Sequence, residues 1–574
     1  MNISRNPSTR LNWATPGSSS LSRLPHVGGE VAVSAAGEGA VESVLGRMSD
    51  RFKTKPSPGP ERPTSPASGR GEIRKLRRCA TAFVMVALLC AMSVSTLGAE
   101  PPNIILLMGD DHGWDETGYN GHPHLKTPVL DEMAAAGLRL DRFYSAHPSC
   151  SPTRGSVMTG RHPNRYGTFS PGYSIRPQEV TIAHLLSKAG YTCGHFGKWH
   201  LGPVKAASPT NPGAMGFDEW LSHDNFFELN PVFSRNGGPP QKFEGESSEI
   251  VIVETIQFLS RAQQKKKPFF AVVWFGSPHE PYSGLEKDLA LYDDLPAEYA
   301  EQEFRLTSNQ TGRPTKRPLR DILQERYAEI TAMDRSIGQL RDWLKQEGLR
   351  DNTLVWYCGD NGTPGDGIVT SPYRGQKGNM YEGGIRVPGV IEWPARIGKP
   401  AASKVNSVTS DILPTLCKLA GTAVPDRPLD GIDLTPAIDG RMTERPSPIG
   451  FWAFSAGADA KNKPYIDSKL QEGTTPLVKM MGDLFTRNFK NFHHPTIVDD
   501  DFAGSRVLLG NRYKLIVNSK RGGKATSELF DLHDDPAETR NLVDTKLKVA
   551  ATMQSELRDW QQSVLKSLTA ADYK

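Results

Sequence analysis

The segment Asn103-Ile-Ile-Leu-Leu-Met-Gly-Asp-Asp-His-Gly113 joins an apolar run to a turn that carries two adjacent carboxylates. Three later segments repeat this order of apolar run and polar end, at residues 192–200, 268–280 and 353–362. Continuous apolar runs are typical of strands that are buried on both faces of a parallel sheet. The four segments therefore predict a largely parallel sheet, and their polar ends are expected to meet at the edge where open α/β sheets bind ligands.

Helical patterns separate these strands along the chain. They cover Thr181 to Ala189, Ile250 to Gln264 and Glu325 to Gln346, and the last has apolar residues at spacings of three and four. The alternation predicts an α/β sandwich with a mainly parallel central sheet over residues 100–440.

The pattern changes beyond residue 440. Strands are expected at Arg512 to Val517 and Leu529 to Leu532, and a terminal helix at Leu547 to Leu565. Residues 441–574 are therefore expected to form a smaller α+β domain.

The first hundred residues have a different character. Residues 1–73 are rich in Ser, Pro, Gly and Arg, and we expect them to be an unfolded tail or the product of a mistaken start site. Residues 74–99 have the basic, apolar, small-residue order of a signal peptide. A single membrane anchor is the alternative, but the apolar run from Ala80 to Val94 is shorter than the ~20 residues that span a bilayer. We therefore expect no stable membrane span, and export to the periplasm or the extracellular space.

Charge and cysteine content narrow the functional class. Residues 1–99 carry 13 Lys and Arg against 6 Asp and Glu, which leaves 55 against 58 in residues 100–574. The main body thus lacks the basic excess of a nucleic-acid-binding protein. Four scattered cysteines remain after residue 99, which make neither a disulfide framework nor a zinc site of close Cys and His spacing.

Two polar pairs follow the first and last predicted strands of the parallel set. Asp110 and Asp111 form one pair, and Asp360 and Asn361 the other. Oxygen-only ligands indicate calcium or magnesium rather than zinc. The pairs are equally compatible with ordinary turn and helix-cap residues, so the metal reading depends on their combination with a second feature.

That second feature is Cys150-Ser-Pro-Thr-Arg-Gly-Ser-Val-Met-Thr-Gly160, together with Gly197-Lys-Trp-His-Leu-Gly202. Both closely resemble signatures of the sulfatase family, in which the cysteine of Cys-x-Pro-x-Arg is oxidised to formylglycine. The resemblance covers roughly residues 102–440. It implies the alkaline-phosphatase-like α/β sandwich, hydrolysis of a sulfate ester, and a formylglycine-generating or sulfatase-maturating enzyme as a partner.

The resemblance also assigns site residues by position. The metal, usually calcium, with magnesium as the alternative, would be held by Asp110, Asp111, Asp360, Asn361 and the modified Cys150. The catalytic and sulfate-binding residues would be Cys150, Arg154, Lys198, His200, His279 and Lys377, the last within a family-like segment at residues 375–388.

The chemistry of sulfate ester cleavage suggests a role for each group. One hydroxyl of the formylglycine hydrate would attack sulfur, and loss of a proton from the other would expel sulfate. Arg154, Lys198 and Lys377 would stabilise the transferring group. His279 is the candidate acid for the leaving oxygen, and His200 the candidate base for the expulsion step.

Two other functions remain open from sequence. One is a phosphonate or phosphate ester hydrolase of the same superfamily, and the other is an inactive sugar-binding relative. The substrate is expected to be a sulfated small molecule or polysaccharide. Residues 217–281, including Asp224 to Phe227 and the loop Arg235 to Pro240, are expected to border its pocket, whose aromatic residues suit a sugar or an aryl group. Analogy with exported sulfatases favours a carbohydrate sulfate.

Overall fold

The computed structural model describes residues 100–307, 313–454, 462–476 and 486–573, which all belong to one compact unit, Ser95–Lys574. The expected tail at residues 1–73 and the expected signal peptide at residues 74–99 lie outside the described residues, and both stay predictions.

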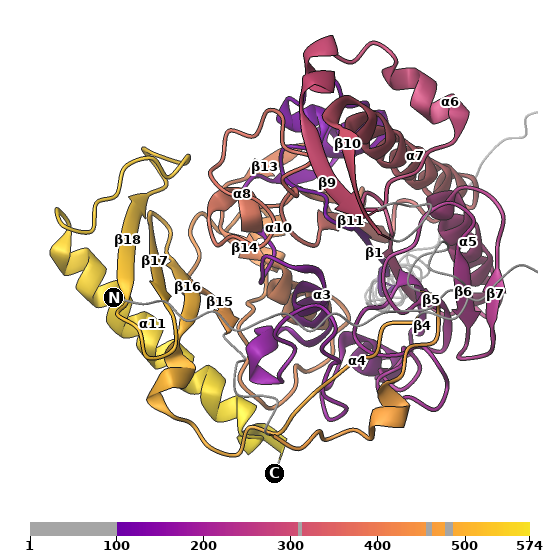
Figure 1. Ribbon diagram of the computed structural model, residues 1–574. Coiled ribbons are helices and arrows are strands. Elements are labelled where there is room, and N and C mark those ends of the chain that lie inside the picture. Colours follow the sequence, from indigo (N-terminus) through magenta and orange to yellow (C-terminus); the bar gives the residue numbers. More distant parts are fainter. Residues whose placement is uncertain (1–99, 308–312, 455–461, 477–485, 574) are drawn as a thin grey trace, which may run out of the picture. The chain divides into compact units, whose positions relative to one another are not determined.

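Within these residues, a sheet of ten strands forms the centre (Figure 1). The strands are β1 (Asn103–Gly109), β2 (Leu138–Leu140), β4 (Thr192–Lys198), β5 (Glu219–His223), β6 (Val232–Arg235), β7 (Pro240–Lys242), β8 (Phe269–Trp274), β11 (Thr353–Gly359), β12 (Gly389–Glu392) and β13 (Ala401–Ser403). Their order is β13-β2-β12-β11-β1-β8-β4-β5-β6-β7. The stretch from β11 to β5 is parallel throughout, whereas β12, β6 and β7 pair in antiparallel fashion.

The strand register aligns the carboxyl ends of the parallel strands. Gly109 at the end of β1 lies opposite Gly359 at the end of β11. On the other side of β1, Met108 lies opposite Trp274 of β8, which in turn lies opposite Gly197 of β4. The polar residues that follow these strands therefore leave the sheet at one edge.

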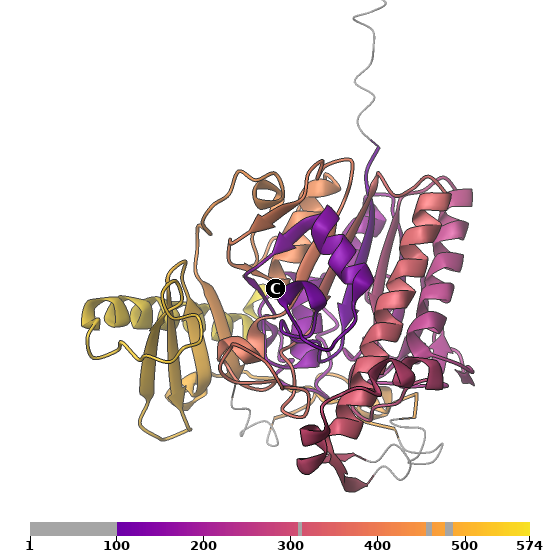
Figure 2. The same ribbon diagram turned by 90° about the horizontal axis from the view of Figure 1, so that it is seen from above.

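Helices cover both faces of the sheet. On one face, α2 (Pro128–Ala136), α5 (Ser247–Gln264) and α7 (Leu319–Gln346) pack on Ile105 and Leu107 of β1, and α5 and α7 lie side by side (Figure 2). On the other face, α3 (Cys150–Thr159), α4 (Ile182–Lys188) and α9 (Ile412–Leu419) belong to the core that contains Ile104 and Leu106. Successive residues of β1 thus enter two apolar cores, which explains its unbroken apolar run.

A second, antiparallel sheet lies in the C-terminal part of the chain. It contains β15 (Ile449–Phe454), β16 (Gly504–Leu509), β17 (Tyr513–Ser519) and β18 (Thr526–Asp531), paired in sequence order. Helix α11 (Leu547–Leu568) packs along this sheet, with Leu557 in one core with Leu515 and Leu529 (Figure 1). The smaller α+β part is thereby confirmed, and its boundary at residue 440 stays a prediction.

Some elements differ from the sequence expectation. Helix α7 begins at Leu319 rather than Glu325, and α5 begins at Ser247 behind the cap Glu246. The sequence did not indicate the short or half-exposed strands, because their patterns are brief and partly polar. These include β2, β5, β6, β7, β12, β13, β15 and β16, the pair β3 (Phe143–Tyr144) and β14 (Ser407–Val408), and the hairpin of β9 (Glu303–Thr307) and β10 (Pro314–Pro318). The remaining α-helices are the short α6 (Glu286–Leu289), α8 (Glu382–Ile385) and α10 (Thr435–Ile438).

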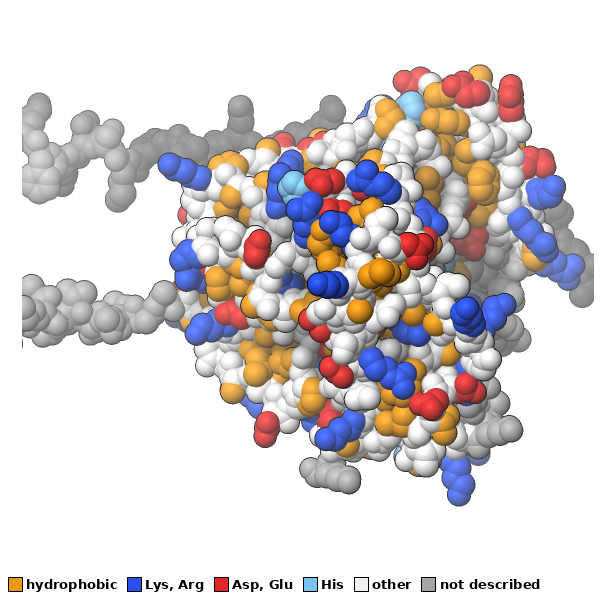
Figure 3. All heavy atoms as spheres, turned by 90° about the vertical axis from the view of Figure 1, so that its left-hand side faces the viewer, with side chains coloured by type: hydrophobic (Ala, Val, Ile, Leu, Met, Phe, Trp, Pro, Cys, Tyr) orange, Lys and Arg blue, Asp and Glu red, His pale blue; other side chains and the backbone are white. Residues whose placement is uncertain are grey.

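The surface carries both signs of charge. On the face shown in Figure 3, basic and acidic side chains are interspersed, in keeping with the near-neutral balance of residues 100–574. Among the described helices, none combines the length and the apolar character that crossing a membrane requires.

Candidate active site

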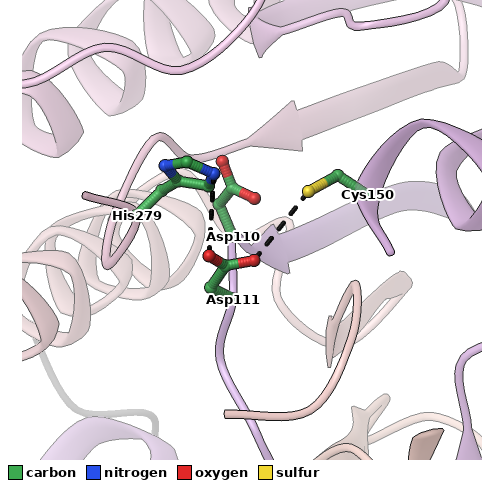
Figure 4. A group of neighbouring side chains, drawn as sticks. All are labelled: Asp110, Asp111, Cys150 and His279. Carbon is green, nitrogen blue, oxygen red and sulfur yellow. Dashed lines mark hydrogen bonds and ion pairs between the residues drawn. The ribbon is translucent and has the colours of Figure 1, made fainter. Parts of the chain in front are cut away.

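Two buried aspartates follow β1. Asp110 is 0% exposed and Asp111 is 2% exposed. Asp111 adopts a positive φ of 61°, in the left-handed region that is uncommon for L-residues but that Asp and Asn visit more often than others. The two carboxylates thereby reach the same group of side chains, together with Cys150 and His279 (Figure 4).

The pair that follows β11 lies directly against the first pair. The backbone N–H of Asp111 donates to Oδ1 of Asp360 over 2.9 Å. The Asn361 side-chain amide donates to Oδ1 of Asp111, also over 2.9 Å. The register between Gly109 and Gly359 therefore brings together two acidic segments that are 250 residues apart along the chain.

Cys150 is the first residue of α3, and its buried thiol faces Asp111. The Sγ atom lies 3.8 Å from Oδ1 of Asp111 (Figure 4). Burial raises the pKa of the Cys150 thiol, and Lys198 and Lys377 only partly oppose this effect. An unmodified Cys150 is therefore a protonated, weakly nucleophilic thiol in this position.

Arg154 lies one helical turn after Cys150 and points to the same side. Its Nε and Nη2 donate to Oδ2 of Asp360 at 3.1 and 2.7 Å, and Nη1 donates to the backbone oxygen of Lys198 at 3.3 Å. Its guanidinium lies 5.1 Å from the centre of the Trp274 ring. The first turn of α3 is thus tied to the ends of β11, β4 and β8.

Lys198 ends β4 and reaches the other aspartate. Its Nζ donates to Oδ2 of Asp110 over 2.5 Å, and both side chains are fully buried. The preceding Gly197 has a φ of +99°, and a Cβ atom there would lie 1.9 Å from the backbone oxygen of Trp274. Only glycine allows β4 to approach β8 this closely just before the lysine.

His200 is buried beside this lysine, and neither of its ring nitrogens has a hydrogen-bond partner among the described residues. Its ring contacts that of Phe489, with centroids 6.4 Å apart. Burial and the nearby cations Lys198 and Arg154 hold the pKa of His200 well below its usual value. The imidazole is therefore neutral and retains a free nitrogen lone pair.

His279 and Lys377 complete the cluster from two separate loops. Nδ1 of His279 lies 2.6 Å from the backbone oxygen of Glu280, an acceptor, so Nδ1 carries the proton and Nε2 faces the site. Nζ of Lys377 lies 2.6 Å from Oδ2 of Asp111 and 3.4 Å from Nε2 of His279. The His279 ring stacks on Phe226, with a centroid distance of 4.5 Å.

The electrostatic balance differs between the carboxylates. Burial alone would raise the pKa of Asp111, but Lys377, His279 and Lys198 outweigh burial and hold it well below its usual value. Burial and repulsion by Asp110 raise the pKa of Asp360 to about 6, against the opposing effect of Arg154. Burial also lowers the pKa of His279 to about 3, despite the attraction of Asp111.

The donor atoms fit a hard divalent cation. Oδ1 of Asp110 and Oδ1 of Asn361 are buried and accept no hydrogen bond from the described residues, although Nη2 of Arg154 lies 3.4 Å from the former. Single ligand atoms of Asp110, Asp111, Cys150 and His279 all lie within 4.8 Å of one another (Figure 4). Buried carboxylates that repel one another, with unused oxygens, suit calcium or magnesium.

Comparison with known proteins places this arrangement in a family. The family model described as Sulfatase matches residues 102–422, more than half of the chain. The chain belongs to the sulfatase family. It is therefore a sulfuric ester hydrolase, as the resemblance in its sequence implied.

Its relatives are similar in sequence and in structure. N-acetylgalactosamine-6-sulfatase of Mus musculus is 31% identical, and the match covers 64% of this chain and 72% of that protein. Arylsulfatase A of Homo sapiens is 32% identical over 80% of this chain and 86% of that protein. Ps i-CgsB, solved in complex with k-i-k-neocarrahexaose, has a TM-score of 0.63 at 23% identity over 81% of this chain and 93% of that chain. This last likeness shows the fold, and it confirms the predicted α/β sandwich.

An open cavity of about 600 Å³ adjoins the charged cluster of the sulfatase. Asp111 and Lys377 form part of its wall, and the rest comes from the loop after β8, from β9 and from the loop after β11. The wall includes Tyr282, Phe304, Arg305, Asp366 and Gln376. The cavity thus places aromatic, amide and charged groups next to the side chains that the sequence predicted for catalysis.

Residues 217–281 are expected to border the substrate pocket, and this cavity meets only part of that segment. Asp224 is not part of its wall, because its buried carboxylate accepts hydrogen bonds from the backbone N–H groups of Val204 and Thr475. The loop 235–240 joins β6 to β7 at the outer edge of the sheet and also lies outside this wall. Within residues 217–281, Phe226 lies at the site through its stacking on His279, and Glu280 lines the cavity.

Sequence reasoning did not find several residues of the sulfatase site. β9 was not expected, so Phe304 and Arg305 carried no signal. Arg326 of α7 is fully buried and donates to the backbone oxygen of Asp111 over 2.7 Å. An arginine within an amphipathic helix is usually solvated. Arg326, however, lies four residues after Ile322 and four before Ile330, on the spacing of the apolar face, and this position is the signal that could have indicated its burial.

Proposed function

We propose that this sulfatase hydrolyses a carbohydrate O-sulfate with a formylglycine made from Cys150 and with calcium at the acidic cluster. The observation that carries the proposal is the position of Cys150. Cys150 is the first residue of α3, and its side chain is buried. Its Sγ atom lies 3.8 Å from Oδ1 of Asp111 in the acidic cluster. A thiol with a raised pKa is a poor nucleophile here, and its oxidised form is well placed for the chemistry.

The residues that would hold the cation are Asp110, Asp111, Asp360, Asn361 and the modified residue 150. When bound, a divalent cation supplies positive charge that makes a nearby hydroxyl more acidic and neutralises charge on sulfuryl oxygens. Nε2 of His279 also lies at this group, 3.6 Å from Oδ2 of Asp111. Magnesium is the alternative ion, because the donors are oxygen atoms in either case.

Formylglycine at position 150 supplies, as its hydrate, a hydroxyl nucleophile for sulfur and a second hydroxyl whose deprotonation releases sulfate. Several cations lie near that position, among them Arg154, Lys198 and Lys377. Arg154 and Lys198 are anchored to Asp360 and Asp110, so their positions are set before substrate binds. Lys377 lies at the cavity wall and would contact the sulfate group directly.

The two histidines are suited to different proton transfers. His200 is neutral, buried and has both ring nitrogens unpartnered within the described part of the chain, so it can accept a proton in the expulsion step. Nε2 of His279 lies 3.4 Å from Nζ of Lys377, a residue of the cavity wall. An anionic sulfate group next to Nε2 favours the imidazolium and raises the pKa of His279, which equips it to protonate the leaving oxygen.

The substrate class is proposed from the relatives and the cavity. N-acetylgalactosamine-6-sulfatase is named for a sugar sulfate, and Ps i-CgsB was solved with an oligosaccharide. The cavity wall offers Phe304 for a sugar ring, and Asp366 and Gln376 for its hydroxyl groups. A phosphonate or phosphate ester is the less favoured substrate, because relatives above 30% identity are named as sulfatases.

We further propose that the protein is exported and that Cys150 is modified before the chain folds. The signal-peptide pattern at residues 74–99 would direct the chain to the periplasm or the extracellular space. A formylglycine-generating or sulfatase-maturating enzyme would act on Cys150 before folding, because the thiol is buried in the folded protein.

Purified protein that was co-expressed with a maturation enzyme should be assayed on a panel of sulfated mono- and disaccharides, one aryl sulfate and one aryl phosphonate. We expect release of sulfate from a sugar, with the phosphonate at least 10-fold slower in kcat/KM. A preference for the phosphonate, or turnover of the aryl sulfate alone across a broad sugar panel, would contradict the proposed substrate class.

A further inference from the structure

Arg326 is a fully buried arginine in the middle of α7. Nε and Nη2 donate to the two carboxylate oxygens of Glu116, both over 2.6 Å, and both side chains are 0% exposed. A two-point pair of this geometry fixes the plane of the guanidinium.

The remaining N–H groups of Arg326 bind the loops of the site. Nη2 donates to the backbone oxygen of Asp111 over 2.7 Å. Nη1 donates to the backbone oxygen of Pro278 over 2.6 Å and to the hydroxyl of Tyr282 over 3.1 Å. The guanidinium thus makes five contacts, which matches its full number of N–H donors.

These contacts join three segments that carry separate site residues. Asp111 belongs to the loop after β1, and Pro278 directly precedes His279 in the loop after β8. The Tyr282 hydroxyl donates to Asp366 over 2.6 Å, and Glu116 accepts from Thr363 over 3.3 Å, so the loop after β11 joins the same network.

We propose that Arg326, held by Glu116, is a positioning residue that fixes the loops after β1, β8 and β11 relative to one another. Asp111 and His279 thereby face the same reacting group. The catalytic consequence rests on the function proposed above for these two residues. An apolar pair of the same volume would fill the space but leave the Asp111 and Pro278 carbonyls without a donor, so the connection between these loops depends on the guanidinium itself.

Arg326→Lys is the test variant, since it keeps the charge but cannot reproduce the planar set of donors. The matched control is Arg445→Lys. Arg445 forms an equally buried two-point pair with Asp411, at 2.6 and 2.8 Å, and its described contacts include no residue of the site. Glu116→Gln is the second variant. It keeps the size of Glu116 but weakens its pair with Arg326, so it still tests the positioning role if Arg326→Lys does not fold.

Two readouts should be measured on the full, matured protein. Hydrogen exchange by mass spectrometry should show at least 10-fold faster exchange in peptides covering residues 109–117 and 276–283 for Arg326→Lys and Glu116→Gln only. The kcat for an aryl sulfate should fall by about 10²-fold in Arg326→Lys with a KM change below 3-fold, since misplacement of reacting groups by about 1 Å has this effect. Arg445→Lys should lower Tm to a similar extent while kcat stays within 3-fold.

The outcomes separate the two proposals. Unchanged exchange in both peptides, or a kcat loss in Arg445→Lys equal to that in Arg326→Lys at matched Tm, would overturn the positioning role. A wild-type protein that shows no sulfatase activity would instead contradict the proposed function, and hydrogen exchange would still decide whether Arg326 holds the loops.

Discussion

The guanidinium of Arg154 binds the carboxylate of Asp360 at the base of the site, with Nη2 2.7 Å and Nε 3.1 Å from the same oxygen, Oδ2. The other oxygen, Oδ1, accepts the backbone N–H of Asp111. Asp360 therefore joins the first turn of the Cys150 helix to the acidic turn after β1. Its substitution should affect both the cation site and the nucleophile.

We expect Asp360→Asn to lower calcium affinity at least 10-fold, because the variant removes one negative charge while keeping the side-chain volume. Isothermal titration with calcium after chelation measures this directly. Asp430→Asn is the control, since Asp430 forms a similar pair with Arg165 at 2.7 and 2.8 Å away from the acidic cluster. Equal affinities in Asp360→Asn and wild type, or full activity after exhaustive chelation, would rule out the metal role.

The active protein should contain formylglycine at position 150. Peptide mass spectrometry should show the Cys150 peptide lighter by the change from CH2SH to CHO, wholly or in part. Cys417, also a buried free cysteine, lacks the Cys-x-Pro-x-Arg context and should remain a thiol in the same sample. Full activity in a preparation that contains only the thiol at position 150 would refute this prediction.

His279→Ala should discriminate between leaving groups. If Nε2 protonates the leaving oxygen, loss of the acid should cost about 10²–10⁴-fold in kcat for a sugar sulfate. An activated aryl sulfate, whose phenolate leaves without help, should lose less than about 10-fold. Steady-state kinetics on both substrates give the comparison, and equal losses on the two would show that His279 is not the acid.

His200→Ala should slow the expulsion of sulfate even with the activated substrate. The reason is that the neutral, unpartnered imidazole is the proposed proton acceptor of that step. Intact-mass measurement during turnover should detect sulfate retained on the protein, with a burst of product before the rate falls. If neither signal appears and the kinetics are normal, His200 is not the base of the expulsion step.

Gly197→Ala should destabilise the fold as well as the site. The new Cβ would lie 1.9 Å from the backbone oxygen of Trp274, and a φ of +99° adds strain of about 1–3 kcal/mol. Gly190→Ala is the control, because Gly190 has a φ of +95° with no atom within 4 Å of the Cβ position. Thermal unfolding should show a larger loss for Gly197→Ala, and similar Tm values for the two variants would show that the close approach of β4 and β8 can relax.

The sequence alone determined the central strands and the identity of the candidate chemical groups. The apolar run at residues 103–108 predicts a strand buried on both faces, because burial of the backbone requires apolar side chains on both sides. Cys150 and Arg154 lie one helical turn apart, so the sequence alone indicates that their side chains are neighbours. Lys198 and His200 likewise follow a single strand within a few residues.

Tertiary structure alone decided how these groups meet. Gly109 and Gly359 lie opposite each other in neighbouring strands, and this register brings Asp111 to Asp360. The stacking of the Phe226 ring on His279 orients the histidine. Arg326 reaches Asp111 across 215 residues of sequence. Such contacts depend on the register of distant strands and on the depth to which a helix is buried. The periodic spacing of α7 places Arg326 on its apolar face, between Ile322 and Ile330, but periodicity does not determine which distant loop a buried side chain contacts.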